Sequence, residues 1–174
     1  MRSAIWENLF RRDDKNYSET ALALRQVPVF GDLKQRELRE IEKIVHRREY
    51  RPGEAIFQQG DPGLGMYIIL KGQVQIVNDQ DPDNLIVYSE LADGDFFGDL
   101  ALVDESDRSA SALATADTRV VAFFRSELAD ILTRFPSLGN KILMNLAKVT
   151  AQRLRKTNDL LIQAQQKPDG EADE

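Results

Sequence analysis

The spacing of hydrophobic and polar positions changes along the chain, and each change predicts a different kind of element. In the first dozen residues Ile5, Trp6, Leu9 and Phe10 recur at helical spacing, and charged residues 11–15 end this stretch. The apolar stripe is either a structural staple against the strands or the final helix, or an exposed face that docks a partner. Residues 1–30 are therefore expected to form an N-terminal helical segment.

Two further helices are expected before the first strand. Ser18 is a suitable N-cap for a helix over residues 19–26, because its hydroxyl can accept a free backbone N–H. Residues 27–31 interrupt the helical pattern, and Asp32 is expected to cap a third helix. The apolar positions of that helix are Leu33, Leu38, Ile41, Ile44 and Val45.

From His46 onward the pattern becomes that of strands. Short runs of β-branched and aromatic residues are separated by Pro-Gly, Gly-Asp-Pro-Gly, Lys-Gly and Asp-Gly turn signals. This spacing predicts about eight short antiparallel strands, and a closed double-sheet roll buries them economically. The expected fold class is mainly β with flanking helices: an eight-stranded antiparallel double-stranded β-helix, or jelly roll, followed by a hinge helix and a long C-terminal helix.

The hinge helix is expected to start near Ser126 and to end at Pro136, which precedes a long helix over residues 137–166. One face of this helix either pairs with a second copy as a parallel coiled coil or packs on the barrel of its own chain. Its positions follow alternating steps of four and three: Leu143, Ala147, Thr150, Leu154, Thr157, Leu161 and Ala164. The expected organisation is residues 1–30, a roll with its hinge helix over 31–136, the helix 137–166, and a disordered tail over 167–174.

Composition narrows the classes of function. The chain has 174 residues, no cysteine, one histidine and a net charge of −6, and no targeting signal is recognisable. We expect a cytoplasmic domain with no direct DNA binding and no membrane association, and we interpret Arg153, Arg155 and Lys156 as a solvated helix face. Because His46 is the single histidine, metal-dependent or nucleophilic catalysis is not expected, so we predict no enzyme, no metal and no cofactor.

Residues 94–114 carry the most informative chemistry. Gly94 and Gly98 permit tight turns, and residues 99–102 have the pattern of a helical turn whose free N–H groups can face an anion. Arg108 follows, with a planar guanidinium that can bind two phosphate oxygens, and small residues 109–111 leave room beside it. The alternative is that Arg108 is a surface arginine paired with Asp99 or Asp107.

This stretch resembles the phosphate-binding cassette of cyclic nucleotide-binding domains, in the runs Phe97–Leu102 and Arg108–Ser111. Residues 50–54, 60–63 and 66–77 also resemble turns and strands of that family. The resemblance implies that Arg108 binds the cyclic phosphate, that Asp99 stands where the family's glutamate holds the ribose 2′-hydroxyl, and that Asp107 replaces the usual proline. The implied ligand-binding residues are Gly98, Asp99, Leu100, Ala101, Arg108, Ser109 and Ala110, with Thr157 toward the base.

The implied function is a stand-alone regulatory domain that binds cAMP, with cGMP as the other ligand, and signals through its C-terminal helices to a downstream protein. Movement of the cassette is expected to pass through Leu100 and Leu102 to the hinge helix near Leu128 and Ile131. The resemblance is also compatible with a degenerate relative that serves as a ligand-independent interaction module. We also expect a homodimer through the long helix.

Overall fold

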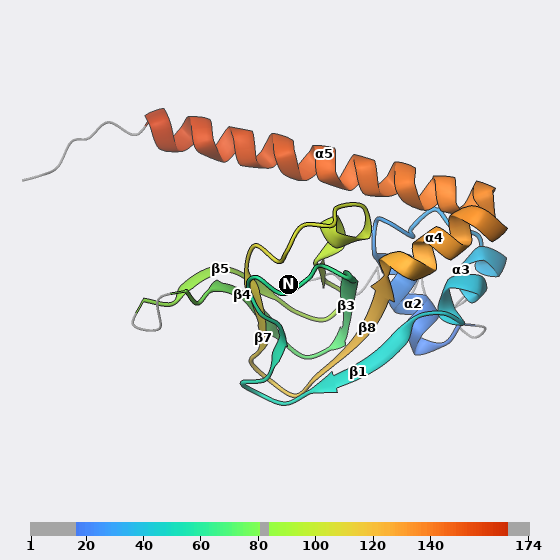
Figure 1. The fold of residues 1–174 in the computed structure, drawn as a ribbon, viewed down its shortest axis with the longest axis horizontal. Coiled ribbons are helices and arrows are strands. Elements are labelled where there is room, and N and C mark those ends of the chain that lie inside the picture. The colour runs from blue at the N-terminus through green and yellow to red at the C-terminus, as the bar shows by residue number, and fades with distance from the viewer. Residues whose placement is uncertain (1–16, 81–83, 167–174) are drawn as a thin grey trace, which may run out of the picture.

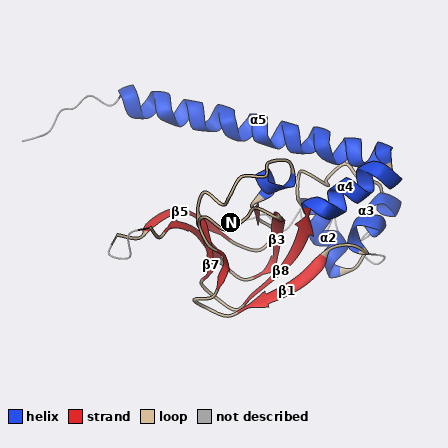
Figure 2. Ribbon diagram, in the orientation of Figure 1, coloured by secondary structure: helices blue, strands red, loops and turns tan. Residues whose placement is uncertain are grey.

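The structure is a computed structural model that describes residues 17–80 and 84–166. Its described part contains eight strands in two four-stranded antiparallel sheets, with the helices at one end and one long helix across the top (Figures 1 and 2). The predicted jelly roll with flanking helices and a long C-terminal helix is therefore confirmed. The strands of the first sheet lie in the order β1 (His46–Tyr50), β8 (Thr118–Phe124), β3 (Gly65–Lys71), β6 (Phe96–Phe97). The strands of the second sheet lie in the order β2 (Ala55–Phe57), β7 (Ser111–Ala114), β4 (Val74–Asn78), β5 (Ile86–Leu91).

The sequence predicted the start of the first described helix correctly and that of the second incorrectly. Helix α2 (Glu19–Gln26) begins after Ser18, whose hydroxyl accepts the Ala21 N–H at 3.1 Å, as predicted. Helix α3 (Gln35–Glu42) begins after Lys34, so the expected cap at Asp32 is wrong. A turn bond from the Leu33 N–H to the Phe30 carbonyl delays the helix, and the Glu37 carboxylate instead accepts the Lys34 N–H at 2.7 Å.

Helix α4 (Arg125–Arg134) and the long helix α5 (Pro136–Gln166) complete the fold. Pro136 is the first residue of α5, a position that tolerates proline because its missing N–H has no helical acceptor. The first half of α5 packs on the domain through Leu138, Ile142, Leu146 and Val149, which join one core with α2, α3 and α4. This packing fixes the elbow between α4 and α5.

The second half of α5 extends beyond the barrel, in the same direction as the hairpin of β4 and β5 (Figure 1). Of the predicted seam, Leu143 packs against the core, whereas Leu154 is 60% exposed and Leu161 56% exposed. The alternative that the whole face packs on its own barrel is thus true only near the start of α5. The stripe at Ile5 to Phe10 and the tail 167–174 lie outside the described residues.

None of the described helices is long and apolar enough to cross a lipid bilayer.

Candidate functional site

The cassette begins at a left-handed glycine. After β6, Gly98 has φ +71° and leads into the single 3₁₀ turn η2 (Asp99–Leu102), which is the predicted helical turn. A Cβ atom at Gly98 would lie 2.7 Å from Nη1 of Arg108. Glycine is therefore required here both for the backbone conformation and for the close approach of the arginine.

Arg108 is buried beneath this turn, with only 8% of its surface exposed. Its Nη1 donates to the Gly98 carbonyl at 3.1 Å and its Nη2 to the Gly65 carbonyl at 2.7 Å. The guanidinium also lies over the Phe57 ring, 4.1 Å from the centroid. The alternative of a surface arginine paired with Asp99 or Asp107 is therefore wrong.

The guanidinium of Arg108 has a hydrogen-bond donor left for an anion. Its Nε is buried without a hydrogen-bond partner among the described residues. Burial lowers the pKa of the Arg108 guanidinium below its ordinary value, because water no longer stabilises the positive charge. A bound anion would relieve this cost and take the remaining N–H donors.

Asp99 is more deeply buried, at 2% exposure, and it is linked to the long helix. One carboxylate oxygen forms an ion pair with Arg153 of α5, whose guanidinium also lies 4.8 Å from the centre of the Phe96 ring. The other oxygen, Oδ2, is buried and has no partner in the described structure. Arg153 is exposed, as the interpretation of a solvated face expects, but the fold also brings it to a carboxylate 54 residues earlier, which that interpretation missed.

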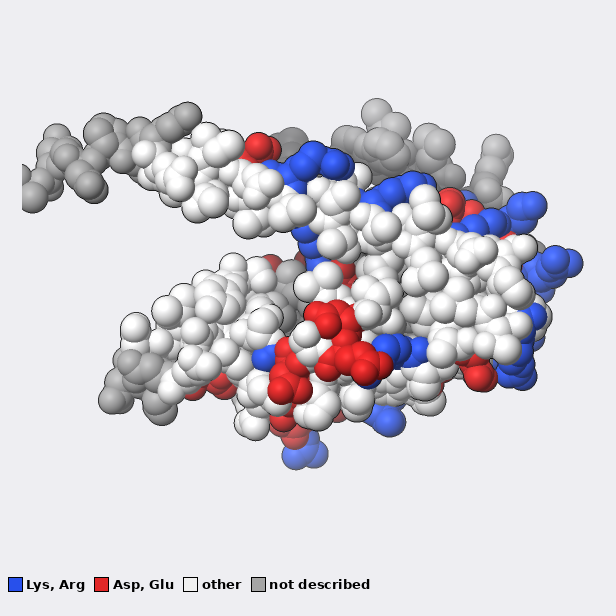
Figure 3. All heavy atoms as spheres, turned by 45° about the horizontal axis from the view of Figure 1, so that its top comes forward, with Lys and Arg blue, Asp and Glu red and all other residues white. Residues whose placement is uncertain are grey.

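These groups line one pocket of about 640 Å³ between the cassette, the sheets and α5. Figure 3 shows a hollow beneath α5, with Lys and Arg on the helix side and a group of Asp and Glu on the opposite lip. The lining includes seven of the eight predicted residues: Gly98, Asp99, Leu100, Ala101, Arg108, Ser109 and Ala110. A nucleotide of modest size is compatible with a pocket of this volume.

Thr157 is the predicted residue that this pocket does not include. It is exposed, and its hydroxyl donates to the Arg153 carbonyl at 3.0 Å. Arg153 and Lys156 line the pocket from α5 instead. Thr157 lies one helical turn after Arg153, on nearly the same face of α5, but it is not part of the pocket lining.

Sequence reasoning missed the wall opposite the cassette. Its members are mostly apolar side chains of the strands, which only the sheet register brings together. A signal was present for Phe96 and Phe97, which directly precede the cassette, but none marked β4 and β5 as neighbours of the site. The missed residues of this wall are Phe57, Ile76, Ser89, Leu91, Phe96 and Phe97, and Ser106 of the cassette loop and Arg153 and Lys156 of α5 were missed as well.

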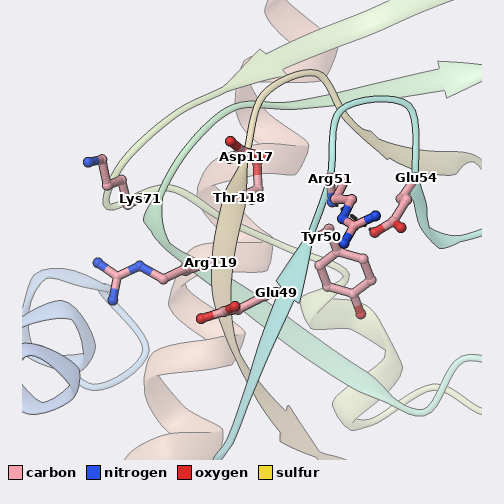
Figure 4. Close-up of a pocket in the computed structure, with 8 residues that line it drawn as sticks. All are labelled: Glu49, Tyr50, Arg51, Glu54, Lys71, Asp117, Thr118 and Arg119. Carbon is pink, nitrogen blue, oxygen red and sulfur yellow. Dashed lines mark hydrogen bonds between the residues drawn. The ribbon is translucent and has the colours of Figure 1, made fainter.

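A second pocket of about 630 Å³ lies over β1 and β8 (Figure 4). Its charges balance, with three basic side chains (Arg51, Lys71 and Arg119) and three acidic ones (Glu49, Glu54 and Asp117). Arg119 already donates to the Glu19 carboxylate at 2.7 and 3.2 Å. Because no partnerless buried polar atom of the described residues belongs to this pocket, it offers no comparable ligand site.

Comparison with known proteins finds matches to one kind of domain. Residues 47–135 match the family model described as the cyclic nucleotide-binding domain. The chain is 34% identical over 131 residues to the cyclic AMP receptor protein of Thermus thermophilus, covering 75% of this chain and 59% of that protein. It is 33% identical over 109 residues to the cAMP-dependent protein kinase regulatory subunit of Colletotrichum orbiculare, covering 63% of this chain and 27% of that subunit.

Among solved structures, a cyclic nucleotide-binding domain from Methylobacillus flagellatus superposes with a TM-score of 0.72 at 26% identity, covering 89% of this chain and 85% of that one. The chain thus spans about three fifths of the length of the Thermus thermophilus protein and about a quarter of the Colletotrichum orbiculare subunit. It covers most of the Methylobacillus flagellatus domain.

Proposed function

Because the chain belongs to the cyclic nucleotide-binding domain family, we propose that it is a sensor that binds cAMP in the pocket beneath α5 and does not catalyse a reaction. One observation carries the proposal. Two buried polar atoms without partners, Oδ2 of Asp99 and Nε of Arg108, belong to side chains that line this pocket. A carboxylate oxygen accepts a hydrogen bond, and a guanidinium nitrogen donates one. The two atoms therefore complement a ribose hydroxyl, which can donate, and a phosphate oxygen, which accepts.

In the proposed complex the cyclic phosphate meets Arg108 and the backbone N–H groups at the start of η2, and the ribose 2′-hydroxyl donates to Asp99. The base lies between the apolar strand residues and α5. We choose adenine first because both curated relatives described above are named for cAMP. Guanine is the alternative base for the same pocket.

The proposed signal leaves the site by two routes. Leu102 is buried in one cluster with Leu128 and Ile131, so movement of η2 is transmitted to α4. The ion pair of Asp99 and Arg153 connects the same turn to α5. Leu100 does not belong to the expected route, because it is 53% exposed and lines the pocket. Nucleotide shifts the angle of α4 and α5 only by its preference for one arrangement.

Calorimetric titration of the purified chain with cAMP and with cGMP tests the function. We expect saturable binding of cAMP with one site per chain. If neither nucleotide binds at millimolar concentration, the cyclic nucleotide sensor is excluded and a ligand-independent interaction module replaces it.

A second expected result concerns the ribose. If Oδ2 of Asp99 accepts the 2′-hydroxyl, 2′-deoxy-cAMP should bind about tenfold more weakly than cAMP, the worth of one hydrogen bond to a charged group. Asp99→Glu restores the reach of the family's glutamate and should tighten cAMP binding by about the same factor. Equal affinities of the two nucleotides in both proteins would assign Asp99 to the ion pair with Arg153 alone.

We also propose that the chain forms a parallel homodimer through the exposed second half of α5. The support is the run of seam positions from Leu154 to Ala164, which one chain leaves in solvent. Such a dimer would bring Thr157 near the pocket of the partner subunit.

A further inference from the structure

Three aromatic rings beside the cassette form one cluster that draws on both sheets. Phe57 of β2 lies 5.8 Å from Tyr67 and 5.8 Å from Phe97, measured between ring centroids. Tyr67 of β3 and Phe97 of β6 are partners in the register of the first sheet, and their rings stack at 5.5 Å. We call these three residues the aromatic cluster. Because each ring contacts the other two, the first sheet helps to fix the ring of Phe57, which belongs to the second.

The guanidinium of Arg108 lies against this cluster. Its carbon Cζ is 4.1 Å from the centroid of the Phe57 ring and 5.9 Å from that of the Tyr67 ring. A cation within about 6 Å of a ring face is attracted by the negative charge of the π system, and more strongly where water is excluded. Arg108 is buried, so Phe57 stabilises a positive charge that burial otherwise disfavours.

The ring of Phe57 restrains a motion of Arg108 that its hydrogen bonds leave free. Nη1 donates to the Gly98 carbonyl and Nη2 to the Gly65 carbonyl, so both ends of the guanidinium are held. Because a carbonyl oxygen accepts over a broad range of angles, the plane can still tilt about the line through these two nitrogens. The Phe57 ring opposes the tilt, which decides where Nε points. This Nε has no partner among the described residues.

We propose that Phe57 is a positioning residue for the ligand, which holds the guanidinium of Arg108 in the orientation that binds an anion. This inference rests on the proposed function, in which Arg108 binds the phosphate. A guanidinium that is already in place loses less side-chain freedom when the anion arrives, so the affinity is higher. Phe57 also lines the pocket, so the alternative role is direct contact between its ring and the nucleotide.

Fluorinated phenylalanines at position 57 separate the two roles. Fluorine withdraws electron density from the ring face with little change of shape, so it weakens the attraction for a cation. We expect the affinity for cAMP to fall stepwise as one, two and three fluorine atoms are added, by about three- to tenfold in all. Phe57→Leu should bind as weakly as the trifluorinated ring. Phe57→Tyr keeps the electron-rich face and should bind like the wild type.

Phe30 provides the matched control. Its ring is buried in the other core cluster, where it meets Phe123 edge to face at 5.5 Å, and it does not line the pocket. Adding three fluorine atoms to Phe30 should therefore leave the affinity for cAMP unchanged. Equal affinities along the series at position 57 would overturn the proposal. Tighter binding with fluorination would also overturn it, because a nucleobase that stacks on Phe57 directly prefers an electron-poor ring.

A measurement on ligand-free protein tests the contact without nucleotide. The Nε–H of Arg108 gives an NMR signal that is assigned by its loss in Arg108→Lys. We expect slow exchange of this proton with water in the wild type and faster exchange with the trifluorinated ring or Phe57→Leu. An unchanged exchange rate would contradict the proposal. If cAMP does not bind but the Nε–H signal responds to the ring, the proposed function fails and the positioning of Arg108 by Phe57 is supported.

Discussion

Arg108→Ala is expected to weaken cAMP binding by about two to four orders of magnitude. The guanidinium would form at least two charge-assisted hydrogen bonds with the phosphate, each contributing about 1.5–3 kcal/mol. Calorimetry with cAMP measures the effect. Arg119→Ala is the matched control, because it removes an arginine that pairs with Glu19 beside the other pocket, and it should leave the affinity unchanged.

The substitution also has a structural cost that must be measured beside the affinity. Arg108 satisfies the carbonyls of Gly98 and Gly65, and without it these acceptors lose their partner. We therefore expect a lower melting temperature for Arg108→Ala. Arg108→Lys keeps the charge but not the planar fork, so it should bind cAMP with intermediate affinity. A folded Arg108→Ala protein with wild-type affinity would remove Arg108 from the site.

Local patterns predicted most of the fold. The Ser18 cap depends only on residues 18 to 21, and most of the eight strands are separated by glycine or proline turns that the sequence shows directly. Asp32 failed as a cap because a local turn from Phe30 to Leu33 delays the helix, and the side chain of Asp32 is engaged elsewhere. Its carboxylate accepts the side-chain amide of Asn145 at 2.6 Å, a contact that depends on how α5 crosses the N-terminal helices.

The cassette was also predictable, because its glycines and Arg108 lie within a few residues of one another. The partners of the charged side chains at the site could not be predicted from local patterns. Arg108 lies over Phe57 because β2 pairs with β7, the strand that follows Arg108, and Asp99 pairs with Arg153 because α5 returns across the cassette. Such long-range pairs follow from sheet register and helix crossing, which no local period encodes.

In the proposed sensor, the ion pair of Asp99 and Arg153 also constrains how a bound nucleotide would signal. One carboxylate oxygen is taken by the helix and the other is unpartnered, so a ribose hydroxyl can bind without displacing Arg153. Ligand would then strengthen a connection that already exists between the cassette and α5. This arrangement favours a nucleotide that holds the long helix in place over one that releases it.

Leu154→Glu is expected to convert the proposed dimer into a monomer. In a parallel pair Leu154 faces its mate, and the substitution places two like charges across the seam. The side chain is 60% exposed in one chain, so the barrel should melt as in the wild type. Sedimentation measures the change, and Gln152→Glu is the control, because it adds the same charge to the same helix outside the seam positions.

Nucleotide binding gives the dimer a second and independent test. Thr157 does not line the pocket of its own chain, and in the proposed dimer it would reach the nucleotide of the partner subunit across the two-fold axis. Thr157→Ala should then weaken cAMP binding by up to about tenfold in the dimer, the worth of one neutral hydrogen bond. In the Leu154→Glu background the same substitution should have no effect, because the partner's pocket is absent. A wild type that sediments as a monomer at high micromolar concentration would refute the dimer and leave Thr157 without a role at the ligand.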